Sequence, residues 1–278
     1  METFPRSFHV AVIPGDGIGP EVMAEALPLL PWARRRGCPL TWECFPHGAD
    51  HYLRTGETLD AATFAHLHDA CDAILFGAVG DPRLPDQRHA EAILLRLRQD
   101  LALGVNLRPC RPLLDRLVPL KDKAARSIHI EVFRENTEGP YVRIGERSEE
   151  GAQDVAVHTK AAVRRLLKAA FERARELDRP LHVAHKANVL KHGHGLWMEL
   201  FHELRDGYAD VSAAPIHADA LLCALVQHPE RFGILAGDNF IGDLTSDLLA
   251  AFQGGMGMAP SLSYAPEPVG RCRALAEP

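Results

Sequence analysis

The sequence lacks the features that mark several classes of protein. No apolar run approaches the roughly 20 residues that a membrane-spanning helix needs, so we expect no membrane partner. The N-terminus shows no basic flank followed by an apolar stretch, so we expect no secretory signal and a cytoplasmic protein. A formal net charge of -6 and a pI near 6.2 leave no overall basic field, so nucleic acid is not an expected partner.

Cysteine pairs at metal-binding spacing are also missing. None of the six cysteines forms a CxxC pair, so we expect reduced thiols rather than a zinc or redox motif. Histidine is more frequent, with 15 residues. His192 and His194 stand two positions apart, so on a helix they point in different directions, and no carboxylate stands beside them at ligand spacing. We interpret them as surface or packing residues.

What is present is the composition and the pattern of a globular α/β protein. The chain has 278 residues, of which 46% are hydrophobic and 24% charged. Short apolar runs at 8–13, 40–45 and 73–76 alternate with helical patterns, and a clear amphipathic helix covers 160–176. Strands and helices continue to alternate as far as position 252, which predicts an open α/β sheet. Between 105 and 160, strand-like runs punctuated by Gly and Pro indicate an extended β-arm.

Two aspartates stand in the segment GDLTSD at 242–247. Asp243 and Asp247 are four positions apart at a predicted helix start, so their carboxylates lie on one face. Asp219 follows a predicted strand and could join them. Three oxygen ligands without a nearby Cys or His suit Mg²⁺ or Mn²⁺. On spacing alone the commoner alternative stays open, in which Asp243 caps the helix and Asp247 is solvated.

Three arginines stand in conspicuous positions. Arg98 lies on an Arg-rich helix, Arg108 precedes a proline, and Arg134 ends an apolar strand. An arginine at the end of a buried strand needs a bound anion or a carboxylate partner. A salt bridge from Arg134 to Glu135 or Glu138 explains the pattern equally well.

Three further features carry weaker signals. Lys186 ends a predicted strand, and a lysine near a metal can have its pKa lowered and act as a base. Tyr141 follows a Gly-Pro turn; alone, each of these two residues is more often structural. The loop PGDGIGP at 14–20 joins the first strand to the first helix, but its third glycine comes one position too early for the dinucleotide fingerprint.

Taken together, the segments resemble the β-decarboxylating dehydrogenases, the family of 3-isopropylmalate, isocitrate, homoisocitrate and tartrate/D-malate dehydrogenases. The resemblance runs from Val10 to about Ser261 and implies the family's open α/β sheet in two parts with a β-arm, not a Rossmann fold. The matching segments are VAVIPGDGIGPEV (10–22), HYLRTGETL (51–59), AILFGAVGDP (73–82), LRLRQDLALGVNLRP (95–109), FRENTEGPYV (133–142), HKANVLKHGHGLW (185–197) and DNFIGDLTSDL (238–248).

The resemblance implies a role for each candidate residue. Arg98, Arg108 and Arg134 match the arginines that hold the substrate carboxylates. Asp243 and Asp247 match ligands of a divalent metal, Mg²⁺ or Mn²⁺, and Asp219 matches a ligand from the partner subunit of a homodimer. Tyr141 matches the residue that protonates the enolate after decarboxylation, and Lys186, which also reaches across the dimer, matches the base. Gly80 in the loop 80–91 and Asn188 match positions beside the cofactor, NAD.

The same resemblance suggests the substrate. Glu91, Leu94 and Leu95 fall where isopropylmalate enzymes carry an acid and two leucines. Two leucines form an apolar wall for an isopropyl group, whereas isocitrate requires a polar group for its third carboxylate. We therefore expect oxidative decarboxylation of 3-isopropylmalate or a similar alkylmalate, with homoisocitrate, D-malate and tartrate as alternatives. Discrimination by one apolar pocket amounts to about 1–3 kcal/mol per methylene.

The pattern changes at the C-terminal end. After Ser261 the resemblance fades, and the segment 274–278 looks like the approach to the family's His-Gly-Ser-Ala-Pro-Asp-Ile adenosine loop. We expect an incomplete cofactor-side domain, residues 1–103 plus 255–278, from a chain that is truncated. A second domain, 104–254, would carry the dimer interface and the arm. A non-catalytic homologue that serves as an interaction subunit is the alternative, although every catalytic position is filled.

Overall fold

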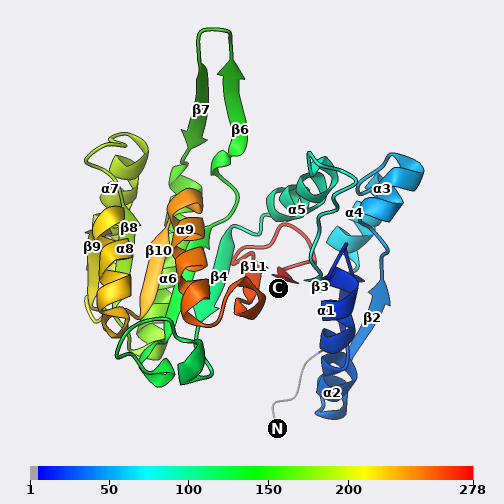
Figure 1. Ribbon diagram of the computed structural model, residues 1–278, viewed down its shortest axis with the longest axis horizontal. Coiled ribbons are helices and arrows are strands. Elements are labelled where there is room, and N and C mark those ends of the chain that lie inside the picture. The colour runs from blue at the N-terminus through cyan, green and yellow to red at the C-terminus, as the bar shows by residue number, and fades with distance from the viewer. Residues whose placement is uncertain (1–5, 278) are drawn as a thin grey trace. The chain divides into compact units, whose positions relative to one another are not determined.

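The computed structural model describes residues 6–277 and divides into two compact units (Figure 1). Unit 1 comprises Met1–Leu103 and Leu262–Pro278, and unit 2 comprises Gly104–Ser261. The second boundary predicted from the sequence lies between 254 and 255, whereas unit 2 continues to Ser261. Residues 1–5 and 278 of the expected first domain lie outside the described residues.

Unit 1 is built on parallel strands with helical crossovers. β1 (Phe8–Ile13) pairs in parallel with β2 (Leu40–Cys44) and β3 (Ala73–Phe76), and β3 pairs in parallel with β12 (Ala274–Glu277). Parallel neighbours cannot be joined by a tight hairpin, so the chain returns through helices between them. These helices are α1 (Gly19–Ala26), α2 (Leu29–Arg35), α3 (Ala49–Thr55), α4 (Ala61–Asp69) and α5 (Arg88–Asp100).

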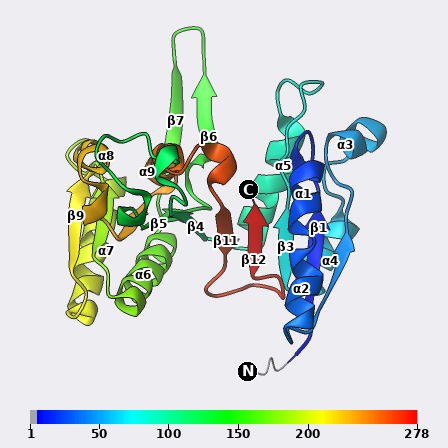
Figure 2. The same cartoon turned by 60° about the horizontal axis from the view of Figure 1, so that its bottom comes forward.

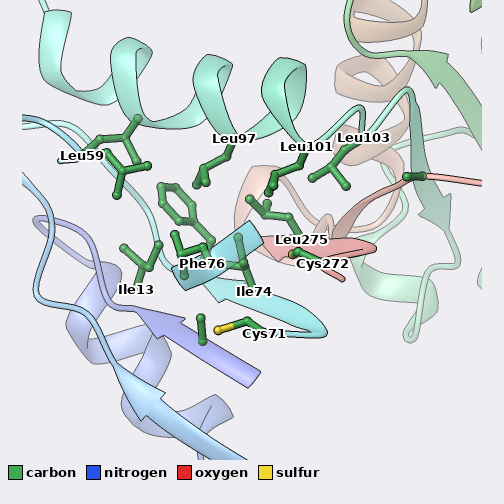
Figure 3. Packing of buried hydrophobic residues seen from close by; sticks show 14 residues of the cluster. Ile13, Leu59, Cys71, Ile74, Phe76, Leu97, Leu101, Leu103, Cys272 and Leu275 are labelled. Atoms are coloured by element: carbon green, nitrogen blue, oxygen red, sulfur yellow. The ribbon is translucent and has the colours of Figure 1, made fainter. Parts of the chain in front are cut away.

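The core of unit 1 combines residues from both ends of the described chain. Figure 3 shows Ile74 and Phe76 of β3 packed against Leu97 of α5, with Leu275 of β12 in the same cluster. Leu275 has no exposed surface, so β12 contributes to the core as fully as β3 does. In Figure 2, β12 lies alongside β3.

Unit 2 contains the strand order β4-β5-β10-β8-β9. β4 (Val105–Cys110) runs antiparallel to β5 (Ile130–Glu135), and the others are parallel: β10 (Ile234–Gly237), β8 (Leu181–His185) and β9 (Ala213–His217). The helices are α6 (Lys160–Leu177), α7 (Gly193–Arg205), α8 (Ala218–Gln227) and α9 (Asn239–Phe252). Short 3-10 turns occupy Asp115–Leu117, Ala125–Ser127, Asp206–Tyr208, Pro229–Arg231 and Met256–Met258, and β11 (Ser261–Tyr264) spans the boundary of the two units.

The two faces of the unit 2 sheet carry different helices. Ile130 and Val132 of β5 share a core with Leu249 of α9, whereas Glu131 between them binds Arg173 of α6 at 2.7 Å. Successive side chains of a strand point to opposite faces, so α9 and α6 cover opposite sides of the sheet. The predicted amphipathic helix is confirmed, because its apolar residues are at most 1% exposed at 163, 166, 167, 170, 171 and 174. The predicted α/β fold class is confirmed as well.

The β-arm is shorter than the sequence pattern predicts. It is a two-stranded antiparallel hairpin of β6 (Gly139–Arg147) and β7 (Ala152–Val157), which extends from unit 2 in Figure 1. The runs near 105 and 130 belong instead to the main sheet as β4 and β5. All residues of β5 are buried. A strand whose side chains are buried on both faces must pack between other elements, and a solvent-exposed arm does not provide such packing.

Side-chain caps set the start of three helices. Asp60 accepts the backbone N–H of Thr63 at α4, Thr159 that of Ala162 at α6, and Asp238 that of Ile241 at α9. Each cap contributes about 1 kcal/mol. Within the described residues, no helix is both long and apolar enough to cross a membrane.

Candidate active site

The predicted acid pair lies on α9, where it faces two arginines of the neighbouring strands. Asp243 and Asp247 are one helical turn apart and share a face. The Nη1 of Arg108, on β4, lies 3.2 Å from Asp243 Oδ1, 3.4 Å from Asp247 Oδ1 and 2.9 Å from Ser246 Oγ. The Nη1 of Arg134, on β5, donates to the same Oδ1 of Asp243. Asp243 therefore joins both arginines.

Arg134 is almost fully buried, with 2% of its surface exposed. Its Nε donates to Asn239 Oδ1 at 2.9 Å, and its guanidinium lies 5.1 Å from the centre of the Tyr141 ring. Neither partner offered by the sequence analysis explains this arginine, because Glu135 points to the opposite face of β5. The Glu135 carboxylate accepts the Thr137 backbone N–H at 3.0 Å, and that of Glu138 accepts the Thr159 backbone N–H at 2.7 Å.

Glycine is required where α9 approaches Arg134. A Cβ at Gly242 would lie 2.8 Å from both Cβ and Cγ of Arg134, closer than carbon atoms pack. The absence of a side chain in the residue before Asp243 therefore permits the close approach of helix and strand.

Tyr141 on β6 completes this group in unit 2. Its hydroxyl donates to Asp243 Oδ2 at 2.7 Å, opposite the oxygen that the arginines share. Burial raises the pKa of Tyr141, and the hydrogen bond to Asp243 raises it further. Burial also raises the pKa of Asp247, with a contribution from the Asp243 charge. The acid pair therefore presents oxygen donors and mutual repulsion, a combination that a hard divalent cation would relieve.

Lys186, directly after β8, and Asp219, in the first turn of α8, form a separate pair. The Lys186 Nζ donates to Asp219 Oδ1 at 2.6 Å, and this hydrogen bond lowers the pKa of Asp219. The buried His194 accepts the Lys186 backbone N–H at 3.0 Å, so it positions the start of the turn that carries the exposed Asn188. In the described chain, the groups of three or more His, Cys, Asp or Glu donors within 4.8 Å of one another do not include Asp219 with Asp243 and Asp247. A single chain thus does not assemble all three predicted metal ligands.

Four predicted substrate residues lie on α5 of unit 1. Arg98 is 6% exposed and pairs with the carboxylate of Glu277 on β12. Leu94 and Leu95 are half-buried, and Leu94 packs against the core of unit 1. Glu91 lies in the first turn of the helix.

Asp16 and His89, which were not among the residues predicted from the sequence, organise the glycine-rich loop of unit 1. The buried Asp16 accepts hydrogen bonds from Ala49 N at 2.6 Å, from Gly80 N at 3.2 Å and from the buried His89 at 2.9 Å. A pocket of about 430 Å³ opens beside this loop, lined by Gly15, Asp16, His47, Asp50, Asp81 and Arg83 among others. The signal was the loop PGDGIGP itself, in which Gly15 has a φ of +75° and no room for a Cβ, since Ala78 O would lie 2.1 Å away.

Comparison with known proteins identifies the family. The family model described as isocitrate/isopropylmalate dehydrogenase matches residues 9–278. The 3-isopropylmalate dehydrogenase of Streptomyces avermitilis is 40% identical over 262 residues, covering 92% of this chain and 75% of that protein. The same enzyme of Thermobifida fusca is 41% identical over 272 residues, covering 94% and 76%.

Solved structures agree with this match. Isocitrate dehydrogenase from Methylococcus capsulatus superposes with a TM-score of 0.83 at 29% identity, covering 97% of this chain and 76% of that one. The TT0538 protein from Thermus thermophilus also has a TM-score of 0.83, at 30% identity, covering 97% and 52%. The chain therefore belongs to the isocitrate/isopropylmalate dehydrogenase family and is a decarboxylating dehydrogenase.

Proposed function

We propose that this chain oxidises and decarboxylates 3-isopropylmalate or a similar alkylmalate, with NAD as the oxidant and Mg²⁺ or Mn²⁺ as the metal. The observation that carries the proposal is the hydrogen-bonded group around Asp243. It brings two guanidinium groups, a phenol and two carboxylates together within unit 2. Each of these groups has a distinct use in the chemistry of a 2-hydroxy dicarboxylic acid.

The arginines supply recognition of the substrate carboxylates. In the structure, Arg108 and Arg134 are neutralised by Asp243 and Asp247. A dicarboxylate can replace these partners, because a guanidinium donor that contacts an aspartate oxygen can donate equally to a carboxylate of the substrate. Arg98 belongs to the same proposal and would exchange its bond to Glu277 for one to the substrate.

The metal would be held by Asp243 and Asp247, with Asp219 supplied by a second copy of the chain in a homodimer. All three offer oxygen donors only, which is the preference of Mg²⁺ and Mn²⁺. Bound there, a divalent cation would acidify the 2-hydroxyl and withdraw electron density as CO₂ leaves. The pairing of Lys186 with Asp219 in one chain supports their joint delivery to the other subunit's site.

Lys186 and Tyr141 would move the protons. The neutral amine of Lys186 would accept the proton of the 2-hydroxyl, and bound NAD would supply the acceptor for the hydride and its two electrons. Tyr141 then donates its phenolic proton to the carbon that loses CO₂. The raised pKa of Tyr141 keeps this proton in place at neutral pH, as a general acid requires.

The substrate and cofactor assignments rest on unit 1 and on the turn after β8. Leu94 and Leu95 would form the apolar wall for the isopropyl group, with Glu91 beside it. NAD would contact the loop at Gly80, whose backbone is held by Asp16, and Asn188. The glycine at position 80 has a φ of +145°, which disfavours every other residue type.

The test is NADH formation by the purified chain. The assay offers 3-isopropylmalate with and without Mn²⁺, beside isocitrate, homoisocitrate, D-malate and tartrate, and repeats each with NADP. We expect metal-dependent NADH formation with the highest kcat/KM for 3-isopropylmalate, abolished in Asp247→Asn and retained in the matched control Asp154→Asn on the exposed arm.

The other outcomes are equally informative. A higher kcat/KM for another acid would keep the chemistry and replace the substrate. If a sample that circular dichroism shows to be folded forms no NADH with any of the acids, the proposal is contradicted. That result would favour a non-catalytic interaction subunit instead.

A further inference from the structure

Four metal-binding side chains meet in unit 1, apart from every residue used above. They are His9 on β1, Glu43 on β2, His66 on α4 and Cys71 in the connection from α4 to β3. One donor atom from each residue lies within 4.8 Å of every other. The set contains two imidazole nitrogens, one carboxylate oxygen and one sulfur.

The register of the sheet explains how residues so far apart in the chain converge. His9 pairs with Thr41 and Ala11 with Glu43 in the parallel ladder, so positions 9 and 11 share a face with 41 and 43. Ala11 belongs to the core cluster that also contains Leu67 and Cys71, so this is the face that α4 covers. The helix presents His66 to that face, and the chain reaches Cys71 two residues after the helix ends.

The contacts within the group point its donors toward one another. Nε2 of His9 lies 2.7 Å from Glu43 Oε1, and Nε2 of His66 contacts the same oxygen. The other ring nitrogen of His9 lies 2.8 Å from Thr41 Oγ1, which fixes the orientation of that ring. A second contact of this kind typically orients histidines that bind metals.

The exposure of the four side chains decreases from the solvent side of the group to the core. The His66 side chain is 44% exposed and that of Glu43 39%, whereas Cys71 is fully buried at the inner side. Hydrogen bonding alone explains why His9, Glu43 and His66 lie together, but it does not explain the position of Cys71. The sulfur on its buried side completes a set of four donors, with an open side through which an ion can enter.

We propose that His9, Glu43, His66 and Cys71 form a structural Zn²⁺ site that ties β1 and β2 to α4 and the start of β3. Four protein ligands of mixed N, O and S type fill the tetrahedral shell of Zn²⁺ and leave no position for substrate, which is the pattern of a structural site. A thiolate and a carboxylate together balance the charge of the ion. Binding replaces the imidazole–carboxylate hydrogen bonds with bonds to the metal, and the thiol proton passes to water.

This site is chemically distinct from the acid pair of unit 2. Sulfur and imidazole donors favour Zn²⁺ and Co²⁺, whereas the oxygen donors of Asp243 and Asp247 suit Mg²⁺ and Mn²⁺. The two sites can therefore be loaded separately, and the zinc site can be tested without any assay of dehydrogenase activity.

The test is titration of the purified chain with Co²⁺ in excess Mg²⁺. We expect one equivalent of Co²⁺ to produce intense tetrahedral d–d bands and a thiolate-to-metal charge-transfer band, both displaced by Zn²⁺. Cys71→Ser should remove the charge-transfer band, and His66→Gln should weaken Co²⁺ binding at least tenfold. Thr41→Val should weaken it about 10–100-fold through the orientation of His9.

Matched controls separate this site from others. His68→Gln changes another histidine of α4, Cys44→Ser changes the exposed cysteine next to Glu43, and Asp243→Asn changes the acid pair; all three should keep the bands. At the same concentration, Zn²⁺ should raise the melting temperature of the parent chain more than that of His66→Gln. A folded parent chain without a charge-transfer band, or a band that survives Cys71→Ser, would overturn the proposal. If Cys71→Ser fails to fold, the exposed His66 still decides the result, since unchanged Co²⁺ affinity in His66→Gln overturns it.

Discussion

At the scale of single residues, Asp243 holds the group in unit 2 together. One of its oxygens accepts from Arg108 and Arg134 and the other from Tyr141. These three donors come from β4, β5 and β6, so one carboxylate on α9 connects three strands. The cost of an unpaired buried guanidinium explains why a carboxylate stands opposite Arg134.

Tyr141 allows the proposed proton transfer to be tested alone. Tyr141→Phe keeps the ring beside the Arg134 guanidinium and removes only the hydroxyl, so we expect kcat to fall about 100-fold or more with little change in KM. Because the pKa of Tyr141 is raised, its proton should be lost only as pH rises above the ordinary tyrosine value of about 10, and its donor function should persist throughout the neutral range. Steady-state kinetics with the control Tyr208→Phe measure this, and an unchanged kcat would assign the proton to another group.

At the scale of secondary-structure elements, the approach of α9 to β5 depends on Gly242. Gly242→Ala should lower the free energy of unfolding by about 1–3 kcal/mol, because the new Cβ must push Arg134 or the helix away. It should also lower kcat, since Asp243 is the next residue. Urea denaturation measures the stability. Gly195→Ala in α7, where a Cβ meets nothing within 4 Å, is the matched control and should be neutral or stabilising. If Gly242→Ala and Gly195→Ala have the same free energy of unfolding, α9 can shift to accommodate the new Cβ.

The cap of α4 has a pH dependence whose sign follows from Asp60. The hydrogen bond from the Thr63 hydroxyl, and then that from its backbone N–H, holds the pKa of Asp60 well below its usual range. A carboxyl whose pKa is lower in the folded state stabilises the fold above its unfolded pKa of about 3.9. That contribution is lost as pH falls through the folded pKa.

Asp60→Ala should therefore cost about 1 kcal/mol of unfolding free energy at pH 7, and the difference from the parent chain should shrink below about pH 4. Asp60→Asn keeps an acceptor for the helix N-terminus and should retain most of the stability at neutral pH. Urea denaturation at a series of pH values measures both. A difference that stays constant down to low pH would show that the charge of Asp60 plays no part.

At the scale of the whole molecule, the proposed site needs residues that one chain does not assemble. Asp219 pairs with Lys186 in its own chain and is not grouped with Asp243 and Asp247. If two copies exchange these residues, Asp219→Asn and Asp243→Asn should each be inactive, and chains refolded together should recover about one quarter of the parent activity. This fraction arises because half of randomly formed dimers are mixed, and each mixed dimer has one intact site. If a mixture shown to contain mixed dimers recovers no activity, each site is built within one chain.

The sequence by itself determined the features that depend on local spacing and on ordered motifs. The i, i+4 spacing of Asp243 and Asp247 placed both carboxylates on one face of α9, and helical periodicity identified the buried stripe of α6. The ordered segments indicated the family, because many short matches in the same order rarely occur by chance. Alternating strands and helices predicted the α/β class.

Only the tertiary structure decided which distant residues meet. Arg134 contacts Asp243 across 109 positions, and Arg98 contacts Glu277 across 179. Sequence proximity suggests Glu135 or Glu138 as the partner of Arg134, but alternation along β5 turns Glu135 to the other face of the sheet. The absence of a CxxC pair argued against zinc, yet the β1–β2 register and the packing of α4 bring His9, Glu43, His66 and Cys71 together. Local periodicity specifies the face of an element, whereas strand order and register specify its neighbour, and these follow from the packing of the whole unit.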